Sequence, residues 1–174
     1  MSMQERPKAV TLKGNPLTLL GPELKAGDPA PNFTVTANDF KPVTLADFKG
    51  KTKVLLPLFS VETPVCDAEM KQFNAAAAEL PNTQILVLSM DLPFSQKRYC
   101  AAAGVDKIKV LSDYKDKSFS QAYGVLIKES QLTSRAVFVI DPQDKITYVE
   151  YVSEIGQQPN FDAVLGHLKE AAKA

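Results

Sequence analysis

The apolar residues of this chain gather in short runs that turn-forming residues separate. The segment 52–59 is continuously apolar from residue 54 onward, which is typical of a strand buried on both faces of a sheet. Two shorter β-like runs surround Gly14-Asn15-Pro16 and predict an N-terminal hairpin. Further strands are predicted at 32–38, 83–91, 108–112, 135–141 and 146–152, the last two as an antiparallel hairpin turning at Pro142-Gln143-Asp144.

Helical segments fall between most of these strands. Helices are predicted at 63–80, 94–104, 118–126 and 161–174, with a short helical turn at 44–51 that Gly50 closes. Alternation of strands and helices predicts an α/β fold with a mixed central sheet and helices on both faces. Because no linker or internal repeat interrupts the pattern, residues 1–174 are expected to form one domain, with 1–25 as the hairpin extension.

Composition excludes several classes of partner. The chain has 174 residues, 45% of them hydrophobic, with 20 Lys and Arg against 20 Asp and Glu. Balanced charge without basic stripes argues against nucleic-acid binding. No apolar run approaches the length of roughly 18 residues that crosses a membrane. The first residues lack an apolar signal core, so a cytoplasmic location is expected.

Of the two cysteines, Cys66 has the more informative position. It follows Thr63-Pro64 at the junction between a buried strand and a helix, and proline is favoured at the first helical position. Cys66 therefore falls in the first turn, where unsatisfied N–H groups and the helix dipole stabilise a thiolate. Taken alone, the position also suits a small apolar residue that only packs.

Cys100 and His167, the other candidate groups, argue against a disulfide exchanger and a zinc site. Cys100 lies 34 residues after Cys66 in a separate helical segment and by itself resembles a helix core residue. A Cys-x-x-Cys motif is absent, which argues against a disulfide exchanger. Two cysteines and one histidine, His167, give poor support for a zinc site, and His167 is expected to be an ordinary helix residue. Activation of Cys66 must then come from the helix end, a hydrogen bond or a cation.

Four separated motifs carry a resemblance that covers nearly the whole chain. They are "ETPVC", "SMDLPFSQKRYC", "VLSDYKDKSFSQAYGVLI" and "RAVFVIDPQDKITYVEYVSEI". Together they resemble the bacterial thiol peroxidases, the atypical two-cysteine peroxiredoxins. The resemblance implies a thioredoxin-like fold with an added N-terminal hairpin. It also implies a homodimer that thioredoxin reduces and that needs no metal or organic cofactor.

The resemblance also implies a role for each of four residues. Cys66 corresponds to the peroxidatic cysteine and Cys100 to the resolving cysteine, so peroxide would convert Cys66 to a sulfenic acid and then to an intrachain disulfide. Thr63 corresponds to the hydroxyl that orients the peroxide, and Arg135 to the cation that stabilises the thiolate and the departing oxygen. Without the resemblance, Thr63 would be a helix cap and Arg135 a surface cation at the start of a strand.

The chain departs from the family pattern at two positions. Phe59 stands where the family usually has proline, and Pro57 lies two residues earlier. Glu62 stands where aspartate is common. Neither departure removes a catalytic group.

The expected activity is thioredoxin-dependent reduction of hydrogen peroxide and organic (alkyl) hydroperoxides. A redox-sensing switch or binding protein that uses the same cysteine pair is the alternative. The missing Cys-x-x-Cys argues against a third possibility, a thioredoxin-fold disulfide oxidoreductase.

Overall fold

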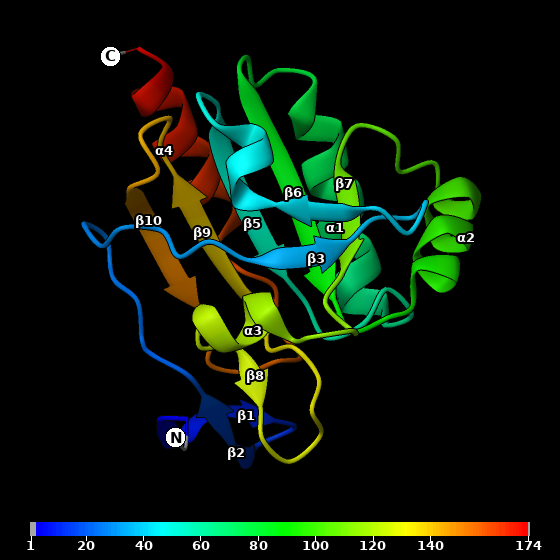
Figure 1. The fold of residues 1–174 in the computed structure, drawn as a ribbon, viewed down its shortest axis with the longest axis vertical. Helices are drawn as coiled ribbons and strands as arrows, with labels where there is room; N and C mark the ends of the chain where they lie inside the picture. Colours follow the sequence, from blue (N-terminus) through cyan, green and yellow to red (C-terminus); the bar gives the residue numbers. More distant parts are fainter. Residues whose placement is uncertain (1–2, 174) are drawn as a thin grey trace.

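The computed structural model describes residues 3–173 and has a seven-stranded mixed sheet at its centre (Figure 1). The strands follow the order β10-β9-β5-β6-β7-β3-β4, in which β5, β6 and β7 run parallel and the other neighbours pair antiparallel. Their bounds are β3 (Thr34–Thr36), β4 (Pro42–Thr44), β5 (Thr52–Pro57), β6 (Thr83–Ser89), β7 (Lys109–Ser112), β9 (Ala136–Ile140) and β10 (Ile146–Tyr151).

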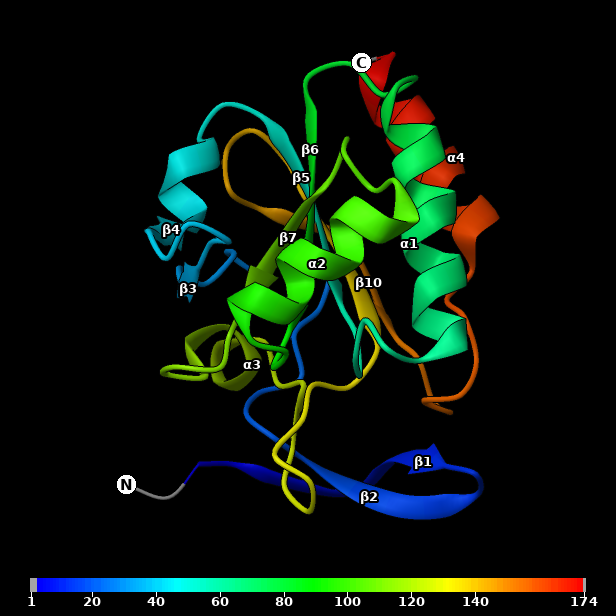
Figure 2. The ribbon, with the colours of Figure 1, turned by 90° about the vertical axis from the view of Figure 1, so that its right-hand side faces the viewer.

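Helices cover both faces of this sheet, as the alternating pattern predicts (Figure 2). Consecutive β5 residues face opposite sides, so Val54 packs in the cluster beneath α1 and α4 while Leu55 packs in the second cluster, with η1 and α3. Helix α2 lies next to α1, and its partly buried residues join the first of these clusters. The helices are η1 (Leu45–Phe48), α1 (Pro64–Ala77), α2 (Pro93–Ala103), α3 (Ser118–Ala122) and α4 (Phe161–Ala172).

The predicted N-terminal hairpin is confirmed and gains a third strand. Strands β1 (Glu5–Leu12) and β2 (Asn15–Leu20) pair antiparallel, and β2 also pairs with β8 (Leu126–Ile127). The connecting turn is Lys13-Gly14, both with positive φ (51° and 81°), so the turn lies earlier than predicted and Asn15 already belongs to a strand. The hairpin lies beside the end of α3, below the main sheet in Figure 1.

Two other boundaries differ from the sequence prediction. The helix predicted at 118–126 ends at Ala122, because Gly124 adopts a positive φ of 67° and the chain then enters β8. A Cβ on Gly124 would lie 1.9 Å from the Pro22 carbonyl oxygen, so the hairpin can approach this turn only where no side chain intervenes. The helix predicted at 63–80 begins at Pro64 as expected but ends at Ala77. Strand β4, which the sequence did not predict, has only three residues and lies at a sheet edge.

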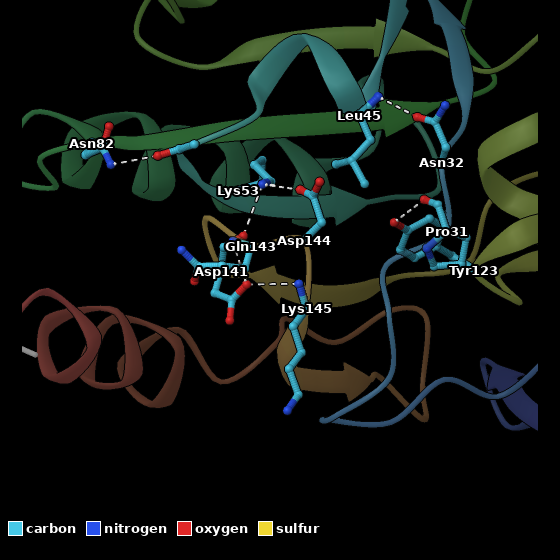
Figure 3. Close-up of polar contacts among 11 residues, drawn as sticks. Pro31, Asn32, Leu45, Lys53, Asn82, Tyr123, Asp141, Gln143, Asp144 and Lys145 are labelled. Carbon is cyan, nitrogen blue, oxygen red and sulfur yellow. Dashed lines mark hydrogen bonds and ion pairs between the residues drawn. The ribbon is translucent and has the colours of Figure 1, made fainter.

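The predicted turn between β9 and β10 is confirmed and is fixed by a buried lysine (Figure 3). Lys53 is fully buried, and its Nζ lies 2.7 Å from Asp144 Oδ1 and 3.1 Å from the Asp141 carbonyl oxygen. The Asp141 carboxylate also accepts hydrogen bonds from the backbone N–H groups of Gln143 and Lys145. These contacts satisfy the ammonium group and hold the turn at the start of β5.

Antiparallel pairing of β5 with β9 has a consequence for the opposite end of the sheet. Lys53 pairs with Ile140 and Leu55 pairs with Phe138, so the first residue of β9 lies toward the end of β5. Helix α1 begins shortly after that end of β5. The sheet register therefore brings the beginning of β9 close to the first turn of α1.

Candidate active site

The first turn of α1 carries Cys66, as the sequence predicts. Thr63 is the N-cap, with an extended backbone (φ −87°, ψ 143°), and its Oγ1 accepts a hydrogen bond from the Cys66 N–H at 3.3 Å. The Thr63 hydroxyl donates in turn to the Ser60 carbonyl oxygen at 3.2 Å. Pro64 occupies the first helical position, where its missing N–H leaves no gap in the hydrogen bonding.

A buried arginine faces the Cys66 sulfur. Arg135 Nη2 lies 3.0 Å from Cys66 Sγ, and both residues are buried, with exposed fractions of 1% and 0%. The guanidinium also donates from Nε to the Ile155 carbonyl oxygen at 3.1 Å and from Nη1 to Glu69 Oε2. Arg135 is therefore not the surface cation that its position in the sequence suggests. The guanidinium therefore places a fixed positive charge beside the Cys66 sulfur.

Glu69 is a member of the site that the sequence analysis missed. Burial raises its pKa to about 7, although Arg135 acts in the opposite direction. Its Oε1 is buried and has no hydrogen-bond partner. One guanidinium therefore serves two acidic groups, the Glu69 carboxyl and the Cys66 thiol. The signal was present in the sequence, since Cys66, Glu69 and Phe73 follow the spacing of a helix's buried face.

The second cysteine lies on the neighbouring helix. Cys100 is half-buried in the C-terminal part of α2 and packs against the cluster that contains Cys66. Burial raises the pKa of the Cys100 thiol, so the group favours its protonated form in this state. Both cysteines are free thiols in this structure. Cys100 also lines an open hollow of about 610 Å³ that faces the β3–β4 turn.

Comparison with known proteins identifies the family. The Redoxin family profile matches residues 25–165. Thiol peroxidases of Oceanobacillus iheyensis and Bacillus subtilis are 54% and 47% identical to this chain, over 92% and 95% of it and 98% and 96% of their own lengths. The chain belongs to the bacterial thiol peroxidases of the Redoxin family. It is thus a thiol-dependent peroxidase of the peroxiredoxin type.

The solved structures agree with this assignment to the thiol peroxidases. A peroxiredoxin-like protein from Aquifex aeolicus superposes with a TM-score of 0.89 at 40% identity, covering 98% of this chain and 99% of that one. The thioredoxin-like fold implied by the sequence motifs is therefore confirmed.

The loop that enters α1 is held from the end of β6 by a carboxylate that the sequence analysis did not single out. Asp91 Oδ1 accepts from Ser60 Oγ at 2.8 Å, and Oδ2 accepts from the Val61 N–H at 2.9 Å and from Ser89 Oγ at 2.6 Å. Asp91 belongs to the same segment of the thiol peroxidase sequence that leads to Cys100. One carboxylate therefore connects the loop before the first cysteine to the segment before the second.

Phe59, at the usual proline position of thiol peroxidases, has a packing role in this loop. Its side chain is half-buried and contacts two clusters, the one that contains Cys66 and the one that the hairpin forms around Val10 and Leu19. The ring therefore restrains the loop by side-chain packing where proline would restrain it through φ. Glu62 is exposed, and its backbone N–H donates to Ser60 Oγ at 3.1 Å.

The remaining candidate groups lie away from Cys66 in this thiol peroxidase. His167 Nε2 lies 2.8 Å from Thr147 Oγ1, and its ring packs beside Tyr148, which fits an ordinary helix residue. Within residues 3–173, no group of three or more His, Cys, Asp or Glu side chains is arranged to hold a metal ion. Over the same residues, no helix has the length and apolar character needed to cross a membrane.

Proposed function

We propose that Cys66 attacks the peroxide, that Cys100 resolves the product as an intrachain disulfide, and that thioredoxin restores both thiols. The substrates proposed are hydrogen peroxide and organic hydroperoxides. The observation that carries this proposal is the position of Arg135 Nη2, 3.0 Å from a sulfur in the first turn of a helix. A cation and a helix N-terminus together favour the thiolate, which is the nucleophilic form.

In the first step the Cys66 thiolate attacks one peroxide oxygen and the O–O bond breaks. The product is a sulfenic acid, and the second oxygen leaves as water or an alcohol after taking up a proton. Arg135 donates to the oxygen on which charge develops. The Thr63 hydroxyl, which now donates to the Ser60 carbonyl, turns its proton toward the peroxide when the substrate binds. Because Cys66 is fully covered, the substrate enters after a small displacement of the surrounding side chains.

In the second step the Cys100 thiolate attacks the sulfenic sulfur, a disulfide forms and water leaves. A thioredoxin dithiol then reduces this disulfide by thiol exchange and is itself oxidised. The raised pKa of Cys100 supports a step in which α2 first opens, because exposure to water removes the burial that causes the shift.

The decisive experiment is a coupled assay with thioredoxin, its reductase and NADPH. Continuous NADPH consumption with hydrogen peroxide and with an organic hydroperoxide is expected. A redox sensor would instead be oxidised once per molecule and then stop. That result would favour the redox-sensing switch over the peroxidase cycle.

Oxidation is expected to give a disulfide within one chain and to change the structure of two segments. A disulfide requires Cα atoms about 4.4–6.8 Å apart, and a pair embedded in two helices rarely meets this without movement. Hydrogen exchange measured before and after one equivalent of peroxide should show the first turn of α1 and the Cys100 part of α2 less protected in the oxidised form. A covalent dimer on a non-reducing gel would contradict the intrachain assignment, and unchanged protection would contradict the movement.

Arg135→Met is expected to slow peroxide attack on Cys66 by roughly 10²–10³-fold, because the variant loses a donor to the developing oxygen charge. Single-turnover reduction of peroxide at a fixed pH measures this rate. Arg98→Met, at an exposed position on α2, is the matched control and should react at the parent's rate. A rate in Arg135→Met equal to that of the parent would show that the 3.0 Å contact does not activate the sulfur.

We also propose that residues 1–174 form one domain with 1–25 as its hairpin extension. Within the described residues 3–173, the shared packing of Leu19 with Ile155 supports this. A homodimer is proposed, and the exposed side chains of Phe40, Leu92 and Phe94 offer it an apolar surface.

The cytoplasm is the proposed location, because a thiol pair that is reduced in every cycle needs a reducing compartment.

A further inference from the structure

A hydrogen bond joins the two helices that carry the cysteines, and each partner is the sequence neighbour of one cysteine. The Tyr99 hydroxyl donates to Asp67 Oδ1 at 2.5 Å. Asp67 follows Cys66 in the first turn of α1, and Tyr99 precedes Cys100 in α2. Breaking this hydrogen bond therefore releases the first turn of α1 and the Cys100 part of α2 together.

We propose that the Tyr99–Asp67 hydrogen bond is a latch that holds α2 against the first turn of α1 and thereby sets how fast the Cys66 sulfenic acid reaches Cys100. The inference rests on the roles proposed above for the two cysteines. It assigns Tyr99 and Asp67 as positioning residues, because neither has to touch the peroxide.

The remainder of α2 explains why this contact is decisive. At its start, the buried Gln96 side chain donates to Ser89 Oγ at 3.1 Å and to the Leu111 carbonyl oxygen at 2.9 Å. After its end, Asn74 Oδ1 of α1 accepts from the backbone N–H groups of Asp106 and Lys107 at 3.2 and 2.7 Å. The Tyr99 contact lies between these two anchors, in the segment that must move.

The Cys100 half of α2 has little burial of its own to hold it. Among the residues of α2, only Pro93 and Gln96 are fully buried, and both belong to the half that precedes Tyr99. Tyr99, Cys100 and Ala103 are only partly buried against the core. A segment with few buried contacts opens at low free-energy cost. The single hydrogen bond of Tyr99 therefore supplies a large part of the free energy that is needed to open this half of α2.

The surroundings of Tyr99 keep it in the donor form. Burial raises the pKa of its hydroxyl, and the hydrogen bond to Asp67 raises it further. Tyr99 and Cys100 both pack against the cluster that contains Cys66. A protonated tyrosine opposite an ionised Asp67, whose pKa the Tyr99 hydrogen bond lowers, makes a charge-assisted contact.

The latch affects which of two products the Cys66 sulfenic acid gives, the disulfide or a sulfinic acid. If α2 opens, Cys100 attacks the sulfenic sulfur, water leaves and the disulfide forms. If α2 stays closed while peroxide is in excess, a second peroxide transfers oxygen to the same sulfur, giving a sulfinic acid and water or an alcohol. Strengthening or weakening the latch therefore shifts the ratio of disulfide to sulfinic acid without changing the first step.

The test compares Tyr99→Phe, which keeps the ring and removes the hydroxyl, with Lys71→Met. Lys71 Nζ lies 3.0 Å from Asp67 Oδ2, so the control removes the other partner of the same carboxylate and leaves the latch in place. The chain has no tryptophan, so the reaction is followed by rapid quenching and mass spectrometry of Cys66. One measurement gives the rate of sulfenic acid formation, and the second gives the rate of its conversion to disulfide.

Tyr99→Phe is expected to form the disulfide about fivefold faster than the parent, as loss of one hydrogen bond predicts. It should also accumulate less sulfinic acid in excess peroxide, exchange amide hydrogens of residues 97–103 faster and leave sulfenic acid formation unchanged. Lys71→Met should match the parent in all four measurements. An unchanged or slower disulfide step in Tyr99→Phe, or an equal gain in Lys71→Met, overturns the latch. If the parent itself forms no sulfenic acid at Cys66, the proposed function fails instead, and the two failures are distinct.

Discussion

Cys66→Ser is expected to abolish peroxide turnover, whereas Cys100→Ser should complete one reaction with peroxide and then stop. A serine hydroxyl at position 66 stays protonated near neutral pH even 3.0 Å from Arg135, so the nucleophile is lost. Cys100→Ser retains the whole first site, namely the helix N-terminus, Thr63 and Arg135, and loses only the thiol that condenses with the sulfenic acid.

The measurement is a single-turnover reaction with one equivalent of peroxide, followed by the coupled thioredoxin assay. Cys100→Ser should consume the first equivalent at the parent's rate and then fail to recycle with thioredoxin. Cys66→Ser should fail in both. Equal loss of the first turnover in the two variants would refute the division of labour between the two cysteines.

Glu69→Ala is expected to lower the free energy of unfolding by about 3–5 kcal/mol, the usual loss when one partner of a buried ion pair is removed. Arg135 is 1% exposed and donates to Glu69 from Nη1, so the variant leaves a buried cation with one fewer acceptor. Urea unfolding gives the value, provided that the slope with urea is unchanged. Glu5→Ala, which breaks the exposed Glu5–Lys128 pair, is the control and should change stability little.

A double variant tests whether the unpaired charge of Arg135 causes the loss of stability in Glu69→Ala. Glu69→Leu with Arg135→Met replaces both charges by apolar groups and should recover much of the stability that Glu69→Ala loses. The same variant should remain a poor peroxidase, because it lacks the cation beside Cys66. If the double variant is no more stable than Glu69→Ala, an unpaired charge is not the cause of the loss.

Glu69 should also leave a signature in the pH dependence of stability. Because its pKa is raised from 4.5 to about 7 in the folded state, chiefly by burial, the folded protein binds its proton more tightly than the unfolded chain. The corresponding stabilisation is complete below about pH 4.5 and is lost as the pH rises through about 7. The free energy of unfolding of the parent, relative to Glu69→Gln, should therefore fall over this interval. A difference that does not change with pH would show that Glu69 keeps its ordinary pKa.

Local sequence signals located most of the sheet strands and the start of α1 correctly, but they missed the short strands β4 and β8. The apolar run within 52–59 predicted β5, and Thr63-Pro64 predicted the cap and first turn that contain Cys66. These features depend on residues close together in the chain, so periodicity and capping chemistry are sufficient to predict them. The helix predicted at 118–126 was wrong beyond Ala122. Gly124 ends it with a positive φ, and the following residues pair as β8 with β2, a distant segment that no local pattern indicates.

By itself, the sequence determined the order of the strands and helices other than β4 and β8, the position of Cys66 in a helix's first turn and the motifs of the thiol peroxidases. Only the tertiary structure decided what surrounds that sulfur. Arg135 is 69 residues from Cys66 and reaches it because β9 runs antiparallel to β5 and begins where α1 begins. Glu69 became a buried partner of that arginine, and Tyr99 became the contact between α1 and α2. Such long-range contacts depend on sheet register and helix packing, which no local pattern in the chain encodes.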